Sequence, residues 1–327
     1  MEIVVSGIRP TGHLHLGNYF GAVKSFVAMQ EVYKCFFFIA DWHSLTTHPH
    51  PEHLQENVKT ILAEYLACGV DPNKATLYIQ SDIRQIAELY LYLNMNAYVG
   101  ELERVTSFKE KVRQNPNNIN AGLLTYPPLM CADIIIHHAD KVPVGKDQEQ
   151  NMEMARRFAT RFNQIYGVNY FKEPASFSFS DKPVKVPGLD GSGKMGKSDG
   201  NAIYLIDDEA TIKKKVMKAV TDAGPTQLNQ EKPEVIQNLF SLVQLVSSPD
   251  TYDYFNDQYN KMTIRYGDLK KQLGEDINAF CAPIREKILA YKNDEKLLAD
   301  IARQGAEVAR ASAEKTIQEV RQIIGFR

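Results

Sequence analysis

The residues with the clearest chemical potential lie near the N-terminus, at positions 6–18, SGIRPTGHLHLGN. The apolar residues 3–5 predict a buried strand before them, and helical spacing of apolar residues follows over 19–30. Glycines let the backbone of such a turn approach a ligand, and free N–H groups at a helix N-terminus attract negative charge. His13 and His15 would add donors toward a phosphate. The segment predicts an anion site, although an ordinary strand-to-helix turn with surface histidines is the simpler alternative.

A second candidate phosphate site is the loop at residues 189–201, LDGSGKMGKSDGN. Gly191 and the triplet 196–198 formally match the P-loop pattern. A P-loop follows a strand and opens a helix, whereas residues 199–201 predict a turn that leads directly into an apolar run. We therefore reject the P-loop interpretation and expect a glycine-rich loop that wraps phosphates.

Two predicted strand ends carry polar residues. Residues 35–40, CFFFIA, predict a central parallel strand, and His43 follows its end, where sites in α/β proteins form. We favour a pocket role for this histidine over one satisfied by the backbone. Residues 141–144 predict another strand, which opens at Gly145 onto a helix. Asp147 would then accept from a ribose hydroxyl or cap the helix.

One carboxylate interrupts an apolar segment. Asp133 lies within residues 121–138, AGLLTYPPLMCADIIIHH, so it requires a hydrogen bond. It either bonds a backbone group within the helix or accepts from a ligand. The nearby Tyr126 and Met130 favour the second role.

The elements that must position these groups alternate between strands and helices. A further strand is predicted at 76–80, and helices are predicted at 51–69, 85–113 and 149–166. This alternation indicates an α/β fold built on a doubly wound parallel sheet. From residue 207 onward the pattern is almost entirely helical.

The composition describes an enzyme-sized globular protein. The chain has 327 residues, of which 44% are apolar and 24% charged, and a net charge of −2. That charge argues against a general polyanion binder, so nucleic acid would have to contact a local basic patch. One candidate is a cluster of lysines, which by default forms a solvated helix face: Lys213, Lys214, Lys215 and Lys218.

The sequence also predicts a cytoplasmic protein without membrane contact. The N-terminus lacks the basic and apolar regions of a signal peptide, and the apolar stretch at 35–40 is too short to span a bilayer. The four cysteines have no CxxC spacing and lie in apolar contexts, which indicates buried reduced thiols.

Two separated motifs resemble those of class I aminoacyl-tRNA synthetases. The HLGN at 15–18, preceded by Pro-Thr-Gly, resembles their HIGH signature, and the KMGKS at 194–198 resembles the KMSKS loop that closes their active sites. The blocks GELER, FKEK, AGLLTYPPLMCADI and VPVGKDQ look like the tryptophanyl branch of bacterial type. The resemblance covers most of the chain and is weakest after about residue 230.

The resemblance implies a two-step reaction. The carboxylate of L-tryptophan attacks the α-phosphate of ATP and expels pyrophosphate, and the terminal adenosine of a tryptophan-specific tRNA then takes the tryptophanyl group. Since a carboxylate is already nucleophilic, catalysis would rest on positioning and charge stabilisation. Mg²⁺ would arrive with ATP, so no protein metal cage is expected. The family also implies a homodimer.

It further implies a Rossmann-like catalytic domain at 1–188, a KMSKS-type loop with a mostly helical tRNA-binding domain at 189–305, and a C-terminal helix at 306–327 that packs back on the first domain. Catalytic roles fall to Lys194, Lys197, Lys111, His15 and Asn18. The ATP site would be lined by Arg9, Pro10, Thr11, Gly17, Asn18, Gly145, Lys146, Asp147, Val186, Lys194, Met195, Gly196, Lys197 and Ser198. The amino-acid pocket would contain Gly7, His43, Tyr126, Met130, Asp133 and Gln148.

Two positions depart from the family pattern. Arg9 stands where Gln is more common, which leaves its contact open, and Gly196 replaces the usual Ser, which predicts a more flexible loop. A tyrosyl-tRNA synthetase, or a nucleotide-binding paralogue without aminoacylation activity, are the alternatives.

Overall fold

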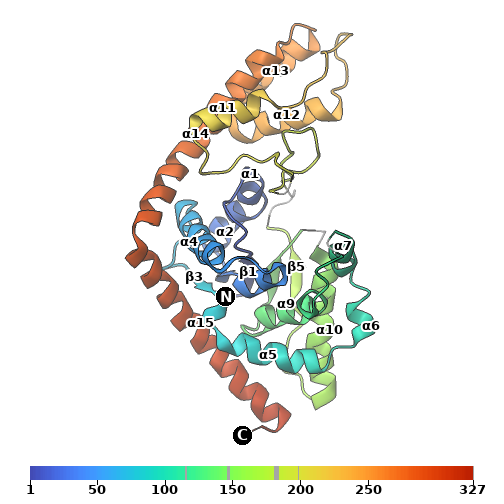
Figure 1. Ribbon diagram of the computed structural model, residues 1–327, viewed down its shortest axis with the longest axis vertical. Coiled ribbons are helices and arrows are strands. Elements are labelled where there is room, and N and C mark those ends of the chain that lie inside the picture. The colour runs from blue at the N-terminus through green and yellow to red at the C-terminus, as the bar shows by residue number, and fades with distance from the viewer. Residues whose placement is uncertain (115, 146–147, 180–183, 198, 327) are drawn as a thin grey trace.

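A five-stranded parallel sheet lies at the centre of the computed structural model, which describes residues 1–114, 116–145, 148–179, 184–197 and 199–326 (Figure 1). The strand order is β3-β2-β1-β4-β5, and each strand runs parallel to its neighbours. The order reverses at β1, and ligands bind beyond the carboxyl ends of strands at such switch points. The predicted Rossmann-like doubly wound sheet is confirmed. The strands are β1 (Ile3–Ile8), β2 (Lys34–Ile39), β3 (Ala75–Ile79), β4 (Lys141–Pro143) and β5 (Ala175–Phe177).

Alternate side chains of the central strands enter two hydrophobic cores on opposite faces of the sheet, as the two-residue period of a strand requires. Val4 and Phe37 lie in a core with α2 (Lys24–Met29) and α4 (Pro51–Ala67). Val5 and Phe36 lie in the other core, with α5 (Arg84–Met95), α9 (Tyr126–Ile135) and α10 (Glu149–Tyr166).

The C-terminal part of the chain is helical, as predicted. The upper lobe in Figure 1 contains α11 (Glu209–Met217), α12 (Glu234–Val246), α13 (Pro249–Asn260) and the start of α14 (Tyr266–Asn293). Farther along, α14 packs on α4, where Lys292 pairs with Glu56 at 2.6 Å. These contacts attach the lobe to the sheet.

The last helix, α15 (Glu295–Ile324), covers the edge strand β3. Ala302 belongs to the first core and Ala309 to the second, so this helix contributes to both faces. Gly305 passes so close to β3 that a Cβ there would lie 1.8 Å from the Leu77 carbonyl oxygen. An open edge strand exposes unpaired backbone groups, and α15 covers these groups on β3.

The prediction of one continuous helix at 85–113 is wrong. The chain there forms three helices, α5, α6 (Val99–Leu102) and α7 (Thr106–Gln114). The side chain of Asn96 donates to the Tyr92 carbonyl at 3.1 Å, which takes the acceptor that a continuing helix would use. Arg161 Nη1 then donates to the Asn96 carbonyl at 3.1 Å. The helix expected at 19–30 also begins differently, with the π-helical turn η1 (Tyr19–Val23) before α2, and β5 was not predicted.

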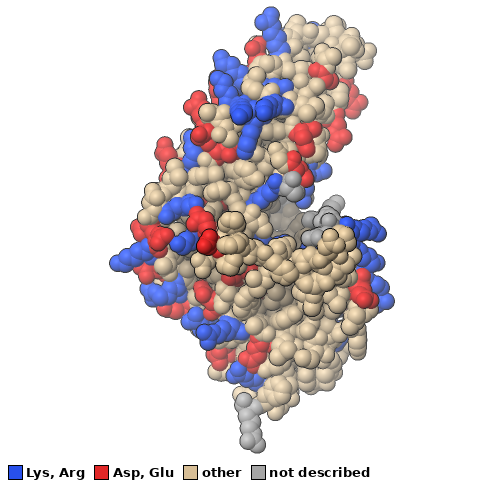
Figure 2. Space-filling view, viewed as in Figure 1, with Lys and Arg blue, Asp and Glu red and all other residues tan. Residues whose placement is uncertain are grey.

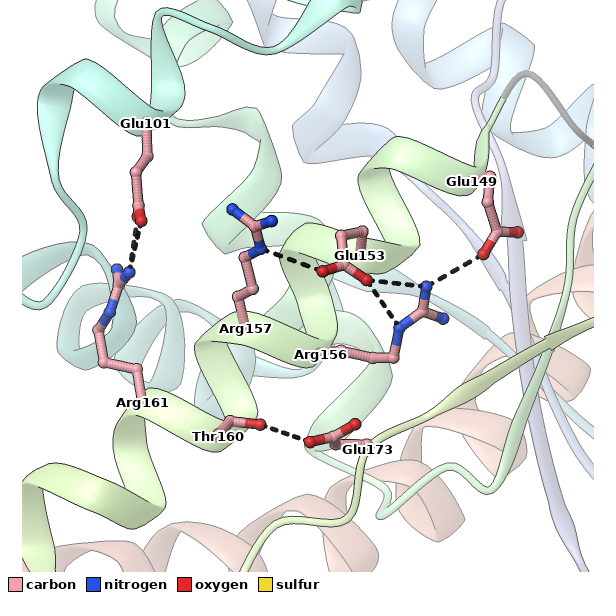
Figure 3. A network of polar contacts seen from close by, with 8 residues as sticks. All are labelled: Glu101, Glu149, Glu153, Arg156, Arg157, Thr160, Arg161 and Glu173. Atoms are coloured by element: carbon pink, nitrogen blue, oxygen red, sulfur yellow. Dashed lines mark hydrogen bonds and ion pairs between the residues drawn. The ribbon is translucent and has the colours of Figure 1, made fainter.

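The outer face of α10 is held by ion pairs (Figure 3). Arg156 bonds Glu149 at 3.0 Å and Glu153 at 3.2 Å, and Arg161 donates to both carboxylate oxygens of Glu101 at 2.8 and 2.7 Å. The second pair ties α10 to α6. These contacts fix the helix whose N-terminus faces the carboxyl ends of the strands.

Candidate active site

The first phosphate-site candidate follows β1, where the chain turns into the short helix α1 (Leu16–Asn18). His15 and Asn18 form a reciprocal cap: Nδ1 of the imidazole accepts the Asn18 N–H at 3.3 Å, and Oδ1 of the amide accepts the His15 N–H at 3.1 Å. A Cβ at Gly17 would lie 2.8 Å from the imidazole ring, so glycine makes room for this arrangement. The cap fixes the imidazole at the start of the helix.

The histidine in this cap is neutral at physiological pH. Burial, followed by the positive charges of Lys197 and Lys194, lowers the pKa of His15 to about 4. Because Nδ1 accepts the Asn18 N–H, the single ring proton lies on Nε2. His15 therefore presents a neutral N–H donor.

The second candidate loop contacts the first. Lys197 Nζ donates to the Gly12 carbonyl at 2.8 Å and to Thr11 Oγ1 at 3.3 Å. Gly12 has φ +99°, a conformation that favours glycine. Burial lowers the pKa of Lys197 to about 8, and the negative charge of Glu64 opposes that decrease. Two glycine-containing segments thus meet around one ammonium group.

Side chains that flank the KMGKS motif hold its loop in place. Asn201 is buried; its carbonyl oxygen accepts the Gly196 N–H at 2.9 Å, and its amide nitrogen donates to Asp190 at 2.9 Å. The Met195 N–H donates to the Val186 carbonyl at 2.8 Å. A Cβ at position 196 would lie 2.5 Å from an oxygen of Asp199, so the glycine that departs from the family pattern allows this close approach.

The residues expected in the amino-acid pocket include a buried polar group. His43 Nε2 donates to one oxygen of Asp133 at 2.7 Å, and Gln80 Nε2 donates to the other at 2.7 Å. Burial raises the pKa of Asp133, although both donors favour its ionised form. The ring of Tyr126 lies edge-on to the imidazole of His43, with centroids 4.6 Å apart.

A positive cluster lies beside this pocket. Lys111 Nζ lies 4.3 Å from the centroid of the Tyr126 ring, a cation–π contact. Burial and the nearby charge of Arg9 lower the pKa of Lys111. Arg9 Nε is buried without a hydrogen-bond partner among the described residues. Lys111 thus contacts the aromatic pocket, and Arg9, the first residue of the loop after β1, lies near enough to lower the pKa of Lys111.

The structure brings many of the predicted site residues into two groups. Lys194, Met195, Gly196 and Lys197 lie with Thr11, His15, Gly17, Asn18 and Val186, whereas His43, Tyr126 and Asp133 lie with Lys111 and Arg9. Pro10 is buried beside Thr11. Others are seen in separate contacts. Gly145 accepts from the backbone of Gln148, Gly7 leaves room for the ring of Phe38, and Met130 packs on the core beneath α9. The predicted residues Lys146, Asp147 and Ser198 lie outside the described residues.

Sequence reasoning missed three residues that support these groups. Gln80 follows β3 and holds Asp133, Asn201 closes the KMGKS loop, and Glu64 of α4 bonds the loop after β1. A signal existed for Glu64, because the apolar residues Ile61, Leu62 and Tyr65 lie beside it in the helix predicted at 51–69.

Comparisons with known proteins identify the family. The chain matches the model for class I tRNA synthetases of the tryptophan and tyrosine types over residues 2–282. It is 70% identical, over the full length of both chains, to the tryptophan–tRNA ligase of Porphyromonas gingivalis. The chain belongs to the tryptophanyl-tRNA synthetases. A second tryptophan–tRNA ligase, from Fusobacterium nucleatum, is 40% identical over the whole chain and 98% of the relative.

A solved tryptophanyl-tRNA synthetase has the same architecture. The enzyme from Campylobacter jejuni, in complex with ADP and tryptophan, superposes with a TM-score of 0.89 and 34% identity, and the match covers 100% of both chains. The family resemblance seen in the sequence is therefore confirmed for the tryptophanyl branch, and the tyrosyl alternative is not favoured.

Proposed function

We propose that the protein activates L-tryptophan with ATP and transfers it to the tRNA for tryptophan. One contact supports this proposal most directly: Lys197 Nζ donates to the Gly12 carbonyl at 2.8 Å, which joins two segments 185 residues apart. Both segments combine glycines with donors suited to phosphate.

In the first step the carboxylate of tryptophan attacks the α-phosphorus of ATP, and the bond to pyrophosphate breaks. The nucleophile is already ionised, so the protein has to align it and stabilise the charge that develops on the phosphates. Lys194 and Lys197 would neutralise the pyrophosphate, with Lys111 assisting. The neutral Nε2–H of His15 and the side chain of Asn18 would contact phosphate oxygens. The product of this step is tryptophanyl-adenylate. In the second step a ribose hydroxyl of the terminal adenosine of the tRNA attacks the carbonyl carbon of this adenylate, and the bond to AMP breaks as the tryptophanyl ester forms.

ATP would lie across the two loops. Since Mg²⁺ prefers phosphate and water oxygens, it would enter as part of MgATP and would need few protein ligands. The nucleotide site would comprise Arg9, Pro10, Thr11, Gly17, Asn18, Gly145, Lys146, Asp147, Val186, Met195, Gly196 and Ser198, together with Lys194 and Lys197.

The tryptophan side chain would lie in the pocket around Asp133. Indole has one donor and no acceptor, and a carboxylate is an acceptor-only partner. Each Asp133 oxygen already accepts one hydrogen bond, from His43 or Gln80, and retains capacity for another. Gly7, Tyr126, Met130 and Gln148 would complete the pocket.

The tRNA would contact the helical part of the chain. Figure 2 shows Lys and Arg side chains gathered on the lobe that contains α11 and α14. Lys213, Lys214 and Lys218 of this lobe are exposed, whereas Lys215 pairs with Asp207 at 2.6 Å. The tRNA-binding region would then be residues 189–305, the catalytic domain 1–188, and 306–327 the helical segment that returns to it.

A second copy of the chain would bind an apolar patch. Met95, Tyr98 and Val99 are 74%, 65% and 59% exposed, and Arg161 stacks its guanidinium on Tyr98 at 4.5 Å. Exposed apolar clusters of this kind mark interaction sites. We therefore propose a homodimer in the cytoplasm. In the part of the chain described here, the structure contains no helix able to span a membrane.

The decisive experiment is ATP–pyrophosphate exchange with tryptophan, tyrosine or no amino acid, followed by charging of the tryptophan tRNA. Exchange that depends on tryptophan, and charging of that tRNA, are expected. Exchange driven by tyrosine would support the tyrosyl alternative, and ATP binding without exchange would support a paralogue without aminoacylation activity.

A further inference from the structure

One buried carboxylate, which is not among the residues proposed to bind substrate, bonds the loop after β1 that is proposed to bind ATP. Glu64 lies on α4 and is fully buried, with Ile61, Leu62 and Tyr65 buried beside it. A carboxylate in apolar surroundings is strongly disfavoured unless its oxygens are hydrogen-bonded. A glutamate at this core-facing position therefore needs hydrogen-bond donors for both carboxylate oxygens.

Both oxygens of Glu64 bond the segment that follows β1. Oε1 lies 2.6 Å from Nδ1 of His13, which is the donor because a carboxylate only accepts, and Oε2 accepts the Leu14 N–H at 2.7 Å. The Leu14 carbonyl in turn accepts the Leu205 N–H at 2.9 Å. Glu64 thus holds two consecutive residues, His13 and Leu14. They connect Gly12, whose carbonyl accepts from Lys197, to the cap formed by His15.

The charge of Glu64 also acts on the second loop. Glu64 bonds His13, and the carboxylate opposes the decrease that burial causes in the pKa of Lys197. Lys197 itself bonds Gly12, the residue before His13. One carboxylate therefore supports the shape of the first loop and attracts the cation of the second.

We propose that Glu64 is a positioning residue of the ATP site: its two hydrogen bonds hold the His13–Leu14 backbone in the shape that receives Lys197, and its negative charge draws the Lys197 ammonium onto that loop. The inference rests on the proposed function, because it assumes that these loops bind the phosphates of ATP. Glu64 touches neither ATP nor tryptophan in this scheme and acts only through its neighbours.

The test uses the full-length protein and tryptophan-dependent ATP–pyrophosphate exchange. Glu64→Gln keeps the size of the side chain and an acceptor for Leu14 but removes the charge. We expect kcat/KM for ATP to fall about tenfold or more, by analogy with the roughly 10–100-fold losses seen when a residue that orients a metal-binding side chain is removed. The KM for tryptophan should stay unchanged, because that substrate lies around Asp133.

The matched control is Glu56→Gln, on the same helix. Glu56 pairs with Lys292 near the protein surface, and its removal should leave both KM values and kcat unchanged. A merely structural role for Glu64 would reduce the melting temperature and the amount of active enzyme while the KM for ATP stayed constant.

A double-mutant cycle with Lys197→Ala tests the coupling. If Glu64 acts through Lys197 and its loop, the double variant should be little worse than Lys197→Ala alone. Effects that multiply, or a Glu64→Gln variant with unchanged kinetics for ATP, would overturn the role of Glu64. A wild-type protein without tryptophan-dependent exchange would instead refute the proposed function. In that case, equal ATP affinity of the wild type and Glu64→Gln by calorimetry would refute the inference as well.

Discussion

Replacing Asp133 should change amino-acid selectivity as well as stability. Hydrogen bonds to charged groups contribute about 1.5–3 kcal/mol, which corresponds to roughly 10- to 150-fold in rate. If the indole N–H of tryptophan donates to Asp133, Asp133→Ala should lower kcat/KM for tryptophan by an amount in this range. The margin over phenylalanine, which has no such donor, should shrink by a similar factor.

A lower melting temperature of Asp133→Ala would not by itself show that Asp133 contacts the substrate. Asp133 accepts from His43 and from Gln80, both buried, so its removal leaves two buried donors without a partner. Each unsatisfied group costs about 1–3 kcal/mol. A decrease in melting temperature is therefore expected whether or not Asp133 contacts the substrate.

Asp133→Asn separates the two effects. The amide keeps one acceptor oxygen, which can still accept the Nε2–H of His43. This variant should be more stable than Asp133→Ala and should retain more of the tryptophan preference, because an acceptor remains but the charge is lost.

The assays are thermal melting and ATP–pyrophosphate exchange with tryptophan and phenylalanine. A suitable control is Thr316→Val, which removes a buried hydrogen bond to the Ile136 carbonyl of 2.7 Å on α15. It should lower the melting temperature without altering selectivity. A destabilised Asp133→Ala enzyme with the wild-type ratio of tryptophan to phenylalanine exchange would refute the pocket role.

Four further predictions concern the loops and the surface. Lys197→Ala should leave the Kd for tryptophan, measured by calorimetry, nearly unchanged. The rate of ATP–pyrophosphate exchange should fall about a hundredfold or more, because a donor to developing charge contributes roughly 2.7–4 kcal/mol. An unchanged exchange rate would contradict this prediction. Wild-type kcat/KM for ATP should fall as the pH rises through about 8, because burial lowers the pKa of Lys197 to about 8 and only the cation stabilises phosphate. Lys197→Arg should lack that decrease. Tyr98→Asp should convert a dimer into monomers in sedimentation, whereas monomeric wild type would contradict the proposed interface. Wild-type affinity for tRNA should fall steeply with salt, since few local lysines supply the contacts.

The sequence predicted the sheet well because its signals are local. Continuous apolar runs such as residues 35–40 identify buried strands, and the motifs at 15–18 and 194–198 lie in the two loops that the structure brings together. The break after α5 was not predictable, because it depends on Arg161 reaching Asn96 from a helix that lies far along the chain.

The supporting residues of the site were harder to find for the same reason. Gln80 is the last residue of the strand predicted at 76–80, and nothing near it in the sequence indicates that it will donate to Asp133. Asn201 lies in a turn-forming triplet, which predicts a turn but not a bond back to Gly196. Such partners are set by tertiary contacts, whereas the residues they hold belong to recognisable motifs.

The position of α15 has a consequence for synthesis of the protein on the ribosome. This helix is translated more than 200 residues after the strand β3 that it covers. At about 5–20 residues per second, a nascent chain spends roughly 10–40 s with that edge uncovered. A chain that terminates before Glu295 would never close it. We therefore expect the nascent chain to depend on chaperones during this interval, and prematurely terminated chains to aggregate rather than persist as partly active enzyme.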